Sequence, residues 1–358
     1  MSNFKILAIN PGSTSTKIAV FSNEECVFVK NLTHASEEIA KYAHIADQFQ
    51  FRKEIILKEL AEAGIDINEI NAVVGRGGLL KPIPSGVYEV NAAMISDLKD
   101  NPIKEHASNL GGLIANDIAK SLPDTKAYIA DPVVVDELED VARISGHPFF
   151  KRESVFHALN QKSIARQHAT NVGKQYEDMN LIIVHMGGGV SVGAHKKGKV
   201  IDVNQALDGE GPFSPERSGT LPAGDLVRLC FSGKYTQAEV MKMITGKGGM
   251  VAFLGTNSAY EAEKKAEAGD IQSQLILEAF VYQVSKHVGA MMTVLKGDVD
   301  AILLTGGIAH GKELMKQIEE RVAKIAPVHV YPGEDEMRAL ANNGLMILKA
   351  EAQPKEYK

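Results

Sequence analysis

The strongest constraint on the fold is a pattern that occurs twice, once near the start of the chain and once near its middle. Each copy has an apolar strand, a turn of small residues and a second strand, and a polar turn and a third strand follow. The copies are ILAINPGSTSTKIAVF at residues 6–21 and LIIVHMGGGVSVGAHKKGKVID at residues 181–202. They begin about half the chain apart, so the sequence predicts two related domains.

Strand and helix patterns alternate along the 358 residues, which predicts an α/β fold. Apolar runs bounded by Gly, Asp or Asn indicate the strands KILAIN, NAVVG, KAYIAD, LIIVHMG and AILLTGG. Apolar residues with helical spacing predict helices at residues 51–63, 108–121, 159–172, 271–295 and 337–349.

Composition limits the classes of partner. The formal net charge of −6 argues against nucleic acid or an anionic membrane, because both attract basic surfaces. No apolar run reaches the roughly 18 residues of a membrane span, and the N-terminus lacks a signal-peptide pattern. The two cysteines, Cys26 and Cys230, lie in no metal-binding spacing. We therefore expect a cytoplasmic protein with neither nucleic acid nor a membrane as its partner.

The first turn contains more hydroxyl groups than a hairpin needs, because two residues such as Asn-Gly suffice to reverse a chain. Backbone N–H groups in small-residue turns form anion-binding nests, so the two repeated turns are candidates for clasping a phosphate chain. The alternative is that both are ordinary hairpins in unrelated domains.

The segment TGGIAHGKE at residues 305–313 nearly spells a P-loop. Gly306, Gly311 and Lys312 have the right spacing, but Glu313 stands where a P-loop needs Ser or Thr for Mg²⁺. A carboxylate there would repel phosphate, so the P-loop interpretation is rejected. A Gly306–Gly307 turn that lets the backbone approach a nucleotide remains, with tight packing at a helix start as the alternative.

Several charged residues stand beside glycines or at strand ends. Arg76 in VGRGG and Arg217 in SPERSGT are flanked by small residues, and a guanidinium fork fits carboxylate or phosphate oxygens. Asp131 ends a strand, where α/β sites gather, although capping a following helix is the alternative. Three histidines lie at similar junctions, although a lone histidine is more often structural: His106, His157 and His185.

Ten motifs in one order resemble the acetate kinase/butyrate kinase family. They are AINPGSTSTK, VGRGG, KEHASNLGG, IADP, VFHALNQKSIAR, VHMGGGVSVGAH, SPERSGTLPAGDL, KGGMVAFLGTN, LLTGGIAHGK and EDEMRALA. The resemblance implies two duplicated ribonuclease H-like domains of the actin-like ATPase type, facing a central nucleotide cleft. We expect the first domain at residues 1–150 with a returning C-terminal helix at 335–358, and the second at 151–334.

The resemblance also implies an activity and roles for single residues. The expected reaction is reversible phosphoryl transfer between ATP and butyrate, with Mg²⁺, in a homo-oligomer. The catalytic positions are Arg76, Arg217, His157 and Asp131. The phosphate and nucleotide positions are Ser13, Ser15, Lys17, His185, Gly187, Gly188, Gly189, Gly306 and Gly307. The Mg²⁺ positions are Asn10 and Glu336, with Glu334 and Asp335 as rivals for the latter.

The sequence departs from acetate kinases at two glycines. HMGGG replaces HLGNG, so Gly188 stands where an Asn side chain would bind, and the backbone must suffice. Gly78 replaces a valine that borders the methyl pocket, which would open space for a longer acid at about 0.8 kcal/mol per buried CH₂. A turn with positive φ at Gly78 is the alternative. Phe156 and His106 complete the expected pocket.

Two other functions stay open at this stage. Isobutyrate, propionate or acetate would serve the same chemistry as butyrate. A nucleotide-driven clamp like actin or Hsp70 would share the fold and transfer nothing to an acid, but it has no need of paired arginines and a histidine.

Overall fold

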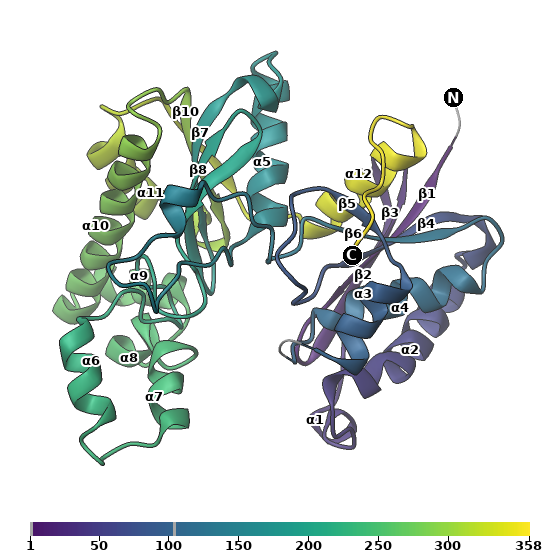
Figure 1. Cartoon of the computed structure of the whole chain (residues 1–358), viewed down its shortest axis with the longest axis horizontal. Helices are drawn as coiled ribbons and strands as arrows, with labels where there is room; N and C mark the ends of the chain where they lie inside the picture. Colours follow the sequence, from purple (N-terminus) through teal and green to yellow (C-terminus); the bar gives the residue numbers. More distant parts are fainter. Residues whose placement is uncertain (1–2, 103–104) are drawn as a thin grey trace. The chain divides into compact units, whose positions relative to one another are not determined.

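The computed structural model describes residues 3–102 and 105–358, which form two compact units (Figure 1). Unit 1 comprises residues up to 135 and from 335 to 358, and unit 2 comprises residues 136–334. The first boundary lies earlier than the expected residue 150, because the segment after Val135 bonds within unit 2. The Glu139 amide donates to the Ile201 carbonyl at 3.0 Å, and the Lys162 ammonium contacts the Glu137 carboxylate at 2.6 Å.

Unit 1 is built on one sheet. Its first three strands form an antiparallel meander, and the first of these strands also pairs with a parallel strand, which pairs with another parallel strand. The strand order among the described residues is β3-β2-β1-β4-β6-β5. The strands are β1 (Lys5–Pro11), β2 (Ser15–Ser22), β3 (Glu25–Thr33), β4 (Ile70–Arg76), β5 (Val87–Glu89) and β6 (Lys126–Ala130).

Unit 2 repeats this plan, because its order β11-β10-β7-β8-β9 also places a meander beside parallel strands. The strands are β7 (Asn180–Met186), β8 (Val190–Lys196), β9 (Lys199–Val203), β10 (Ala301–Gly306) and β11 (Val328–Pro332). Strands β7 to β11 correspond one to one to β1, β2, β3, β4 and β6. The predicted duplication is therefore confirmed, and β5 is an addition in unit 1.

The helices predicted from spacing are present to within about two residues at each end, which is the usual uncertainty of helix boundaries. They are α2 (Phe49–Glu62), α4 (Asn109–Lys120), α5 (Ala158–Asn171), α10 (Ile271–Val294) and α12 (Glu336–Leu348). The sequence pattern did not separate the others: α1 (Ser36–Ile39), α3 (Ala92–Ile95), α6 (Ala223–Cys230), α7 (Gln237–Ile244), α8 (Gly249–Leu254), α9 (Ala259–Glu267) and α11 (Lys312–Val322). None of the helices in the described ranges is long and apolar enough to cross a membrane.

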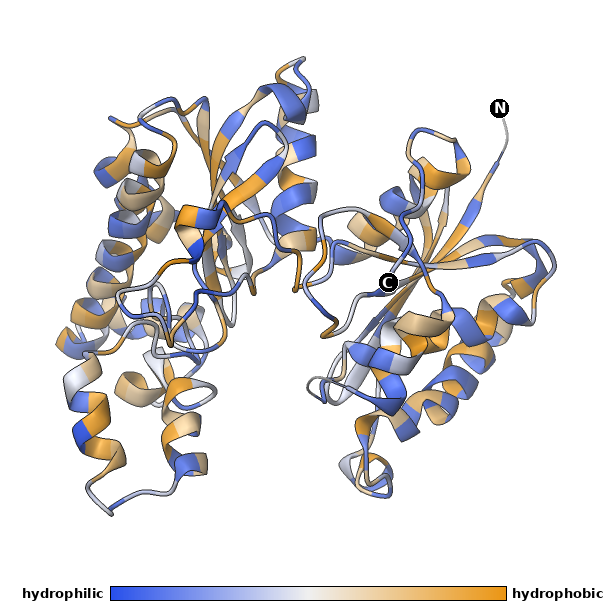
Figure 2. Cartoon of the chain, viewed as in Figure 1, coloured by the Kyte–Doolittle hydropathy of each residue, from blue (hydrophilic) through white to orange (hydrophobic). Residues whose placement is uncertain are grey.

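Helices cover both faces of each sheet, so most strands are hydrophobic along their length while the helices alternate (Figure 2). In unit 1, α2 and α4 lie on one face and α12 on the other. In unit 2, α10 and α11 lie on the face of Ile182 and Val184, and α5 lies on the face of Leu181 and Ile183. The central strands of each sheet are thus buried with an apolar core on both sides, whereas the edge strands β3 and β11 are largely exposed.

Two helices pack in the unit that does not contain the strand before them. Helix α5 follows β6 in the chain but packs on β7 and β10, whereas α12 follows β11 but packs on β1 and β4. The sequence places the C-terminal helix on the first domain, and α12 lies there (Figure 1). Gly344 allows the close approach, because a Cβ on it would lie 2.7 Å from Val74 Cγ2.

Strand β4 and helix α4 touch through their backbones. A Cβ on Gly75 would lie 2.2 Å from the Gly111 carbonyl oxygen, and a Cβ on Gly111 would lie 2.2 Å from the Arg76 carbonyl oxygen. A side chain at either glycine would collide with main chain, which cannot move aside cheaply. The two glycines therefore hold the backbone of Arg76 in place.

We predict opposite effects for two helical Gly-to-Ala changes. Gly111→Ala should lower the free energy of unfolding by 1 kcal/mol or more, roughly the lower end of overpacking costs, because its methyl group meets the Arg76 backbone. Gly289→Ala in α10 has no atom within 4 Å of its new methyl group, so it should stabilise by about 0.5–1 kcal/mol. Denaturant unfolding measures both, and a stabilising Gly111→Ala would contradict the packing described.

Candidate active site

The first repeated turn follows β1 and is short and exposed. The Gly12 amide donates to the Ser15 carbonyl at 2.7 Å and closes the turn, and Ser13 is exposed within it. Asn10 and Lys17 are directly paired across β1 and β2, so their side chains project from the same face of the sheet. The hydroxyl, amide and ammonium groups named by sequence therefore gather at one end of this hairpin.

A buried arginine that the sequence analysis did not single out binds the carbonyl groups of this turn. Arg52 on α2 is 1% exposed, and its guanidinium donates to the carbonyl oxygens of Gly12 at 2.7 Å, Ser13 at 2.9 Å and Ser15 at 3.0 Å. Within the described residues it forms no ion pair with a carboxylate, and burial lowers the pKa of Arg52 to about 10. The Arg52 guanidinium therefore remains charged at neutral pH and fixes the shape of the turn through these three carbonyl groups.

A buried histidine extends this support. His34 Nε2 lies 2.8 Å from Thr16 Oγ1, and Arg52 donates to the same oxygen at 3.2 Å. Burial, with the charge of Arg52 as a smaller cause, lowers the pKa of His34 to about 4. His34 is therefore neutral at pH 7, which avoids placing a second buried positive charge beside Arg52.

Three side chains meet where β1, β4 and α12 come together. The Asn10 amide donates to the Glu336 carboxylate, and Arg76 donates to Asn10 Oδ1 at 3.3 Å and to Glu336 Oε2 at 3.2 Å. Asn10 and Arg76 lie on the sheet face that α12 covers, since Ile6 and Val74 on that face border Gly344. Glu336 begins α12, where the helix dipole favours a negative charge.

The rivals of Glu336 have other partners. Asp335 is the N-cap of α12, and its carboxylate accepts from the Arg338 amide and side chain, each at 3.0 Å. Glu334 belongs to unit 2, where its carboxylate lies 3.9 Å from His185 Nε2. Glu336 is the carboxylate to which the Asn10 amide donates.

Asn10 and Glu336 fit a Mg²⁺ ion chemically. Both offer hard oxygen ligands, and Mg²⁺ is usually held by one or two carboxylates together with water and phosphate oxygens. No group of three or more His, Cys, Asp or Glu side chains arranged to hold a metal lies within residues 3–102 and 105–358.

Asp131 is buried at the end of β6 and holds a neighbouring turn. Its Oδ1 accepts from Ser85 Oγ at 2.6 Å and from the Gly86 amide at 2.8 Å. Its φ of 37° is unusual for a non-glycine residue, and such strain clusters at functional positions. The helix-capping alternative is wrong, because no helix starts at Pro132.

The structure does not support the predicted room at Gly78. Gly78 is buried, and a Cβ on it would lie 2.7 Å from both Asn109 Cα and Leu98 Cδ2. Its φ is not positive either, so close packing against α4 explains the glycine better than both sequence alternatives. His106 is exposed just before α4, with Nδ1 2.7 Å from Ser108 Oγ, and Phe156 is buried in unit 2.

The second repeated turn lies between β7 and β8 in unit 2. The Gly187 amide donates to the Gly189 carbonyl at 2.9 Å. A Cβ on Gly189 would lie 2.0 Å from the Arg217 guanidinium and 3.3 Å from His157 Cε1, so this glycine lets both side chains reach the turn. A Cβ on Gly188 would lie 3.8 Å from Glu216 Oε2, an ordinary van der Waals distance, so packing does not require a glycine there.

Arg217 is held in a loop that curls back to this turn. Its guanidinium donates to the Ala206 carbonyl at 2.6 Å, and Ser214 Oγ donates to the Gly188 carbonyl at 2.7 Å. Burial lowers the pKa of Arg217, against the opposing charges of Glu216 and Asp208. A partly desolvated guanidinium binds an anion more strongly than an exposed one, because water screens it less.

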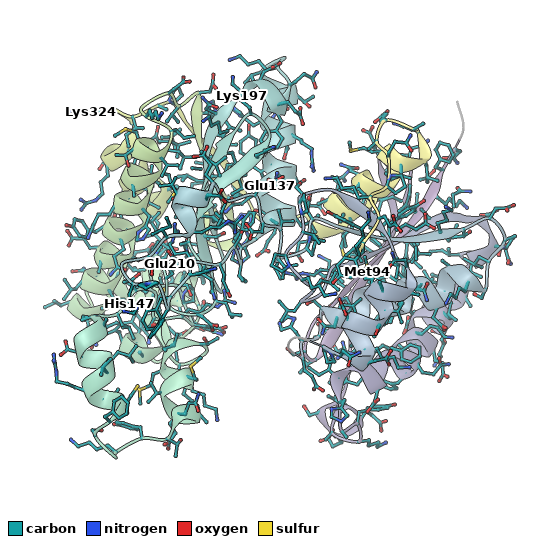
Figure 3. The ribbon with its side chains drawn as sticks, viewed as in Figure 1. Met94, Glu137, His147, Lys197, Glu210 and Lys324 are labelled. Carbon is teal, nitrogen blue, oxygen red and sulfur yellow. The ribbon has the colours of Figure 1, made fainter. Side chains whose placement is uncertain are left out.

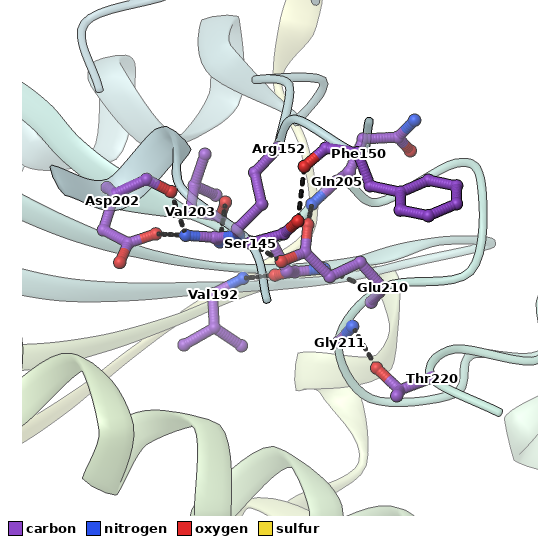
Figure 4. Close-up of polar contacts among 12 residues, drawn as sticks. Ser145, Phe150, Arg152, Val192, Asp202, Val203, Gln205, Glu210, Gly211 and Thr220 are labelled. Atoms are coloured by element: carbon purple, nitrogen blue, oxygen red, sulfur yellow. Dashed lines mark hydrogen bonds and ion pairs between the residues drawn. The ribbon is translucent and has the colours of Figure 1, made fainter. Parts of the chain in front are cut away.

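A second arginine organises the start of that loop (Figure 4). Arg152 donates to Glu210 Oε1 at 2.6 Å, Asp202 Oδ1 at 2.9 Å and the Val203 carbonyl at 3.0 Å, and Glu210 also accepts from the Gln205 amide at 2.7 Å. Burial alone would lower the pKa of Arg152, but the charges of Glu210 and Asp202 raise it. This cluster joins the end of β9 to the loop that carries Arg217.

His157 and His185 lie stacked, with ring centroids 3.8 Å apart and planes 11° apart. His157 stands directly before α5, and its Nδ1 lies 2.8 Å from Ser191 Oγ. His185 is buried near the end of β7, with Nδ1 2.8 Å from Asn160 Oδ1. Because His185 and Ser191 are paired across β7 and β8, both histidines sit on the face that α5 covers.

Gly306 and Gly307, the two glycines of the turn after β10, differ in their surroundings. Gly306 has a φ of 94°, and a Cβ there would lie 2.3 Å from the Met186 carbonyl oxygen, so glycine is required. Gly307 has no atom within 4 Å of its Cβ position. The packing alternative therefore explains Gly306, and Gly307 leaves open space beside the backbone.

The described arrangement thus brings together Asn10, Arg76 and Glu336 in unit 1, and His157, His185, Gly189 and Arg217 in unit 2. It adds Arg52, Arg152 and Ser191, which sequence reasoning missed. Arg52 had one signal, since an arginine stands at a position of α2 that its helical pattern would bury.

Comparison with solved structures identifies the class of fold. The acetate kinase of Porphyromonas gingivalis superimposes with a TM-score of 0.75, covering 96% of this chain and 100% of that chain at 20% identity. The expected pair of duplicated domains is therefore confirmed at the level of fold.

Sequence comparison identifies the family. Residues 147–344 match the model of the acetokinase family. Butyrate kinase 1 of Clostridium acetobutylicum is 60% identical over 355 residues, 99% of this chain and 100% of that protein, and its butyrate kinase 2 is 57% identical over 99% of each. The chain belongs to the acetokinase family, as its motifs suggested.

We predict that Arg52→Lys loosens the first turn, because an ammonium cannot bind three diverging carbonyl groups as the guanidinium fork does. Each lost charged hydrogen bond costs about 1.5–3 kcal/mol, so stability should fall measurably. We expect KM for MgATP to rise and kcat to fall about 10-fold, because a displaced turn binds phosphate less well. The exposed Arg228→Lys is the matched control, and equal kinetics in both variants would contradict this role.

Proposed function

We propose that this chain is a butyrate kinase that transfers the γ-phosphoryl group of ATP reversibly to butyrate, forming butyryl phosphate and ADP. The 60% and 57% identity to butyrate kinases over nearly the whole chain carries the choice of acid. The structure supports the reaction class, because each unit holds an arginine beside a small-residue turn.

The chemistry requires charge neutralisation and no strong base. A short carboxylic acid is already ionised at pH 7, because carboxyl pKa values lie near 4. An anion must therefore approach a polyanion, and charge spreads over the phosphoryl oxygens in the transition state. Arg76 and Arg217 are the candidates for holding the carboxylate and the moving phosphoryl group.

The remaining residues are proposed to hold the nucleotide and the metal. Asn10 and Glu336 would hold Mg²⁺, which when bound neutralises phosphate charge, and Asp131 would position the metal's water through the turn that it bonds. The amide groups of both turns suit phosphate oxygens. The proposed nucleotide contacts are Ser13, Ser15, Lys17, His185, Gly187, Gly188, Gly189, Gly306 and Gly307, with open space at Gly307 beside adenosine.

His157 is proposed to donate a hydrogen bond to the transferred group. We further propose a cytoplasmic location, which the free cysteines Cys26 and Cys230 support, and a homo-oligomeric assembly, which the family resemblance implies. The high identity to two butyrate kinases does not favour propionate, isobutyrate or acetate as the acid.

The first experiment traps acyl phosphate with hydroxylamine, using Mg-ATP and acetate, propionate, butyrate, isobutyrate or valerate. We expect the highest kcat/KM with butyrate and loss of the product when EDTA removes Mg²⁺. A higher value for another acid would overturn the choice of butyrate and keep the mechanism. ATP binding without any trapped product would favour an actin- or Hsp70-like clamp.

Glu336 is tested as the Mg²⁺ ligand by removing its charge. Glu336→Gln keeps the size and removes the charge, so the Mg²⁺ concentration for half-maximal rate should rise about 10-fold or more. Asp335→Asn preserves the N-cap of α12 and should leave the Mg²⁺ dependence unchanged. A shift in Asp335→Asn without one in Glu336→Gln would show that the neighbouring carboxylate holds the metal.

A further inference from the structure

A chain of buried hydrogen bonds leads from the interior of unit 2 to His157. Tyr176 Oη lies 2.7 Å from His195 Nδ1, and His195 Nε2 lies 2.8 Å from Gln161 Oε1. Gln161 Nε2 donates to Ser191 Oγ at 2.8 Å, and Ser191 Oγ lies 2.8 Å from His157 Nδ1. Gln161, Ser191 and His195 are fully buried, so water does not compete for these groups.

The direction of this chain is set by a backbone carbonyl. Gln161 Nε2 also donates to the Ser191 carbonyl oxygen at 3.1 Å, and a carbonyl can only accept. The amide nitrogen of Gln161 must therefore face Ser191, and its oxygen must face His195. His195 Nε2 then carries a hydrogen and donates to that oxygen.

The role of His195 Nδ1 as donor or acceptor follows from the charge of the ring. Burial, with the charge of Lys162 as a smaller cause, lowers the pKa of His195 well below 6.5, so the ring is neutral and Nδ1 accepts from the Tyr176 hydroxyl. Lys162 is itself buried, pairs with Glu137 at 2.6 Å and lies over the Tyr176 ring at 5.6 Å. Glu137 is labelled in Figure 3 and belongs to unit 2.

The assignment of donors and acceptors extends to His157. Ser191 Oγ already accepts from Gln161, and His157 Nδ1 is its other side-chain neighbour in the described ranges. A buried hydroxyl satisfies its own hydrogen, so Ser191 donates to His157 Nδ1. His157 Nδ1 is then unprotonated, and the neutral ring carries its hydrogen on Nε2.

We infer that Gln161, Ser191 and His195 are positioning residues that lock His157 in the Nε2–H tautomer and present it as a hydrogen-bond donor. This inference rests on the proposed function, in which His157 faces the transferred phosphoryl group. A neutral donor stabilises developing negative charge without taking the proton that a general base would take. Gly193 has no side chain because a Cβ there would lie 2.6 Å from Gln161 Oε1, so the strand leaves room for this chain.

The test measures the tautomer directly by ¹⁵N NMR of the histidine-labelled full-length protein. His157 is assigned by the signal lost in His157→Gln. We expect an unprotonated Nδ1 and a protonated Nε2 in the wild type. A protonated Nδ1 on neutral His157 would overturn the inference.

Gln161→Glu reverses the chain with almost no change in size. A carboxylate only accepts, so the Ser191 hydroxyl would turn toward it and His157 Nδ1 would become the donor. We expect the hydrogen of His157 to move to Nδ1 and kcat to fall about 10²–10³-fold, as when one donor to the transition state is lost. An unchanged tautomer in folded Gln161→Glu would overturn the inference.

Ser191→Ala removes the last link and guards against misfolding of the charged variant. We expect kcat to fall about 10-fold with KM little changed, because the ring loses its orientation but keeps its hydrogen-bonding groups. Ser273→Ala is the matched control, since Ser273 is a fully buried serine of unit 2 whose hydroxyl has no partner within the described ranges.

Equal kinetics for Ser191→Ala and Ser273→Ala would overturn the positioning role. Absence of acyl phosphate with every acid in the wild type would overturn the proposed function instead. The NMR experiment contains no substrate, so the two failures are distinguishable.

Discussion

The contact between Asn10, Arg76 and Glu336 is the constraint on which unit 1 depends, because it joins the first strand to the last helix. Without it, the negative charge of Glu336 would be brought against the sheet with no positive partner. Arg76 is in turn placed by the backbone contact with Gly111, and the turn beyond Asn10 is held by Arg52. Asn10, Arg76, Glu336 and the first turn are therefore positioned by the interior of the unit.

Unit 2 follows the same design with different chemistry. In unit 1, the N-terminus of α12 meets the end of β1, and in unit 2, the N-terminus of α5 meets the end of β7. Each of these helices follows the last strand of the other unit in the chain. In unit 1 the residues that meet are Glu336 and Asn10, and in unit 2 they are His157 and His185. The duplicated scaffold thus places a carboxylate at this position in one copy and a histidine in the other. These are the groups proposed to hold Mg²⁺ and to donate to the transferred phosphoryl group.

The duplicated sheets and the main helices were predictable from the sequence, because hydrophobic periodicity and turn residues are local properties of the chain. The repeat at residues 6–21 and 181–202 predicted the duplicated sheets, and α12 was predicted within one residue at each end. Gly78 shows the limit of such reasoning: its small size was interpreted as pocket space, but Asn109 and Leu98 fill that space. A glycine in a sequence does not reveal whether a ligand or another backbone lies beside it.

The sequence by itself determined the α/β class, the duplication, and the residue types gathered at the two small-residue turns. The tertiary structure alone decided which carboxylate of the 334–336 run meets Asn10, because helix phase and capping separate neighbours that look equivalent in one dimension. It alone also showed which carbonyl groups Arg52 binds and that a hydrogen-bond chain leads to His157. These contacts join residues far apart in the chain, and their direction depends on donors and acceptors that only meet when the strands and helices pack.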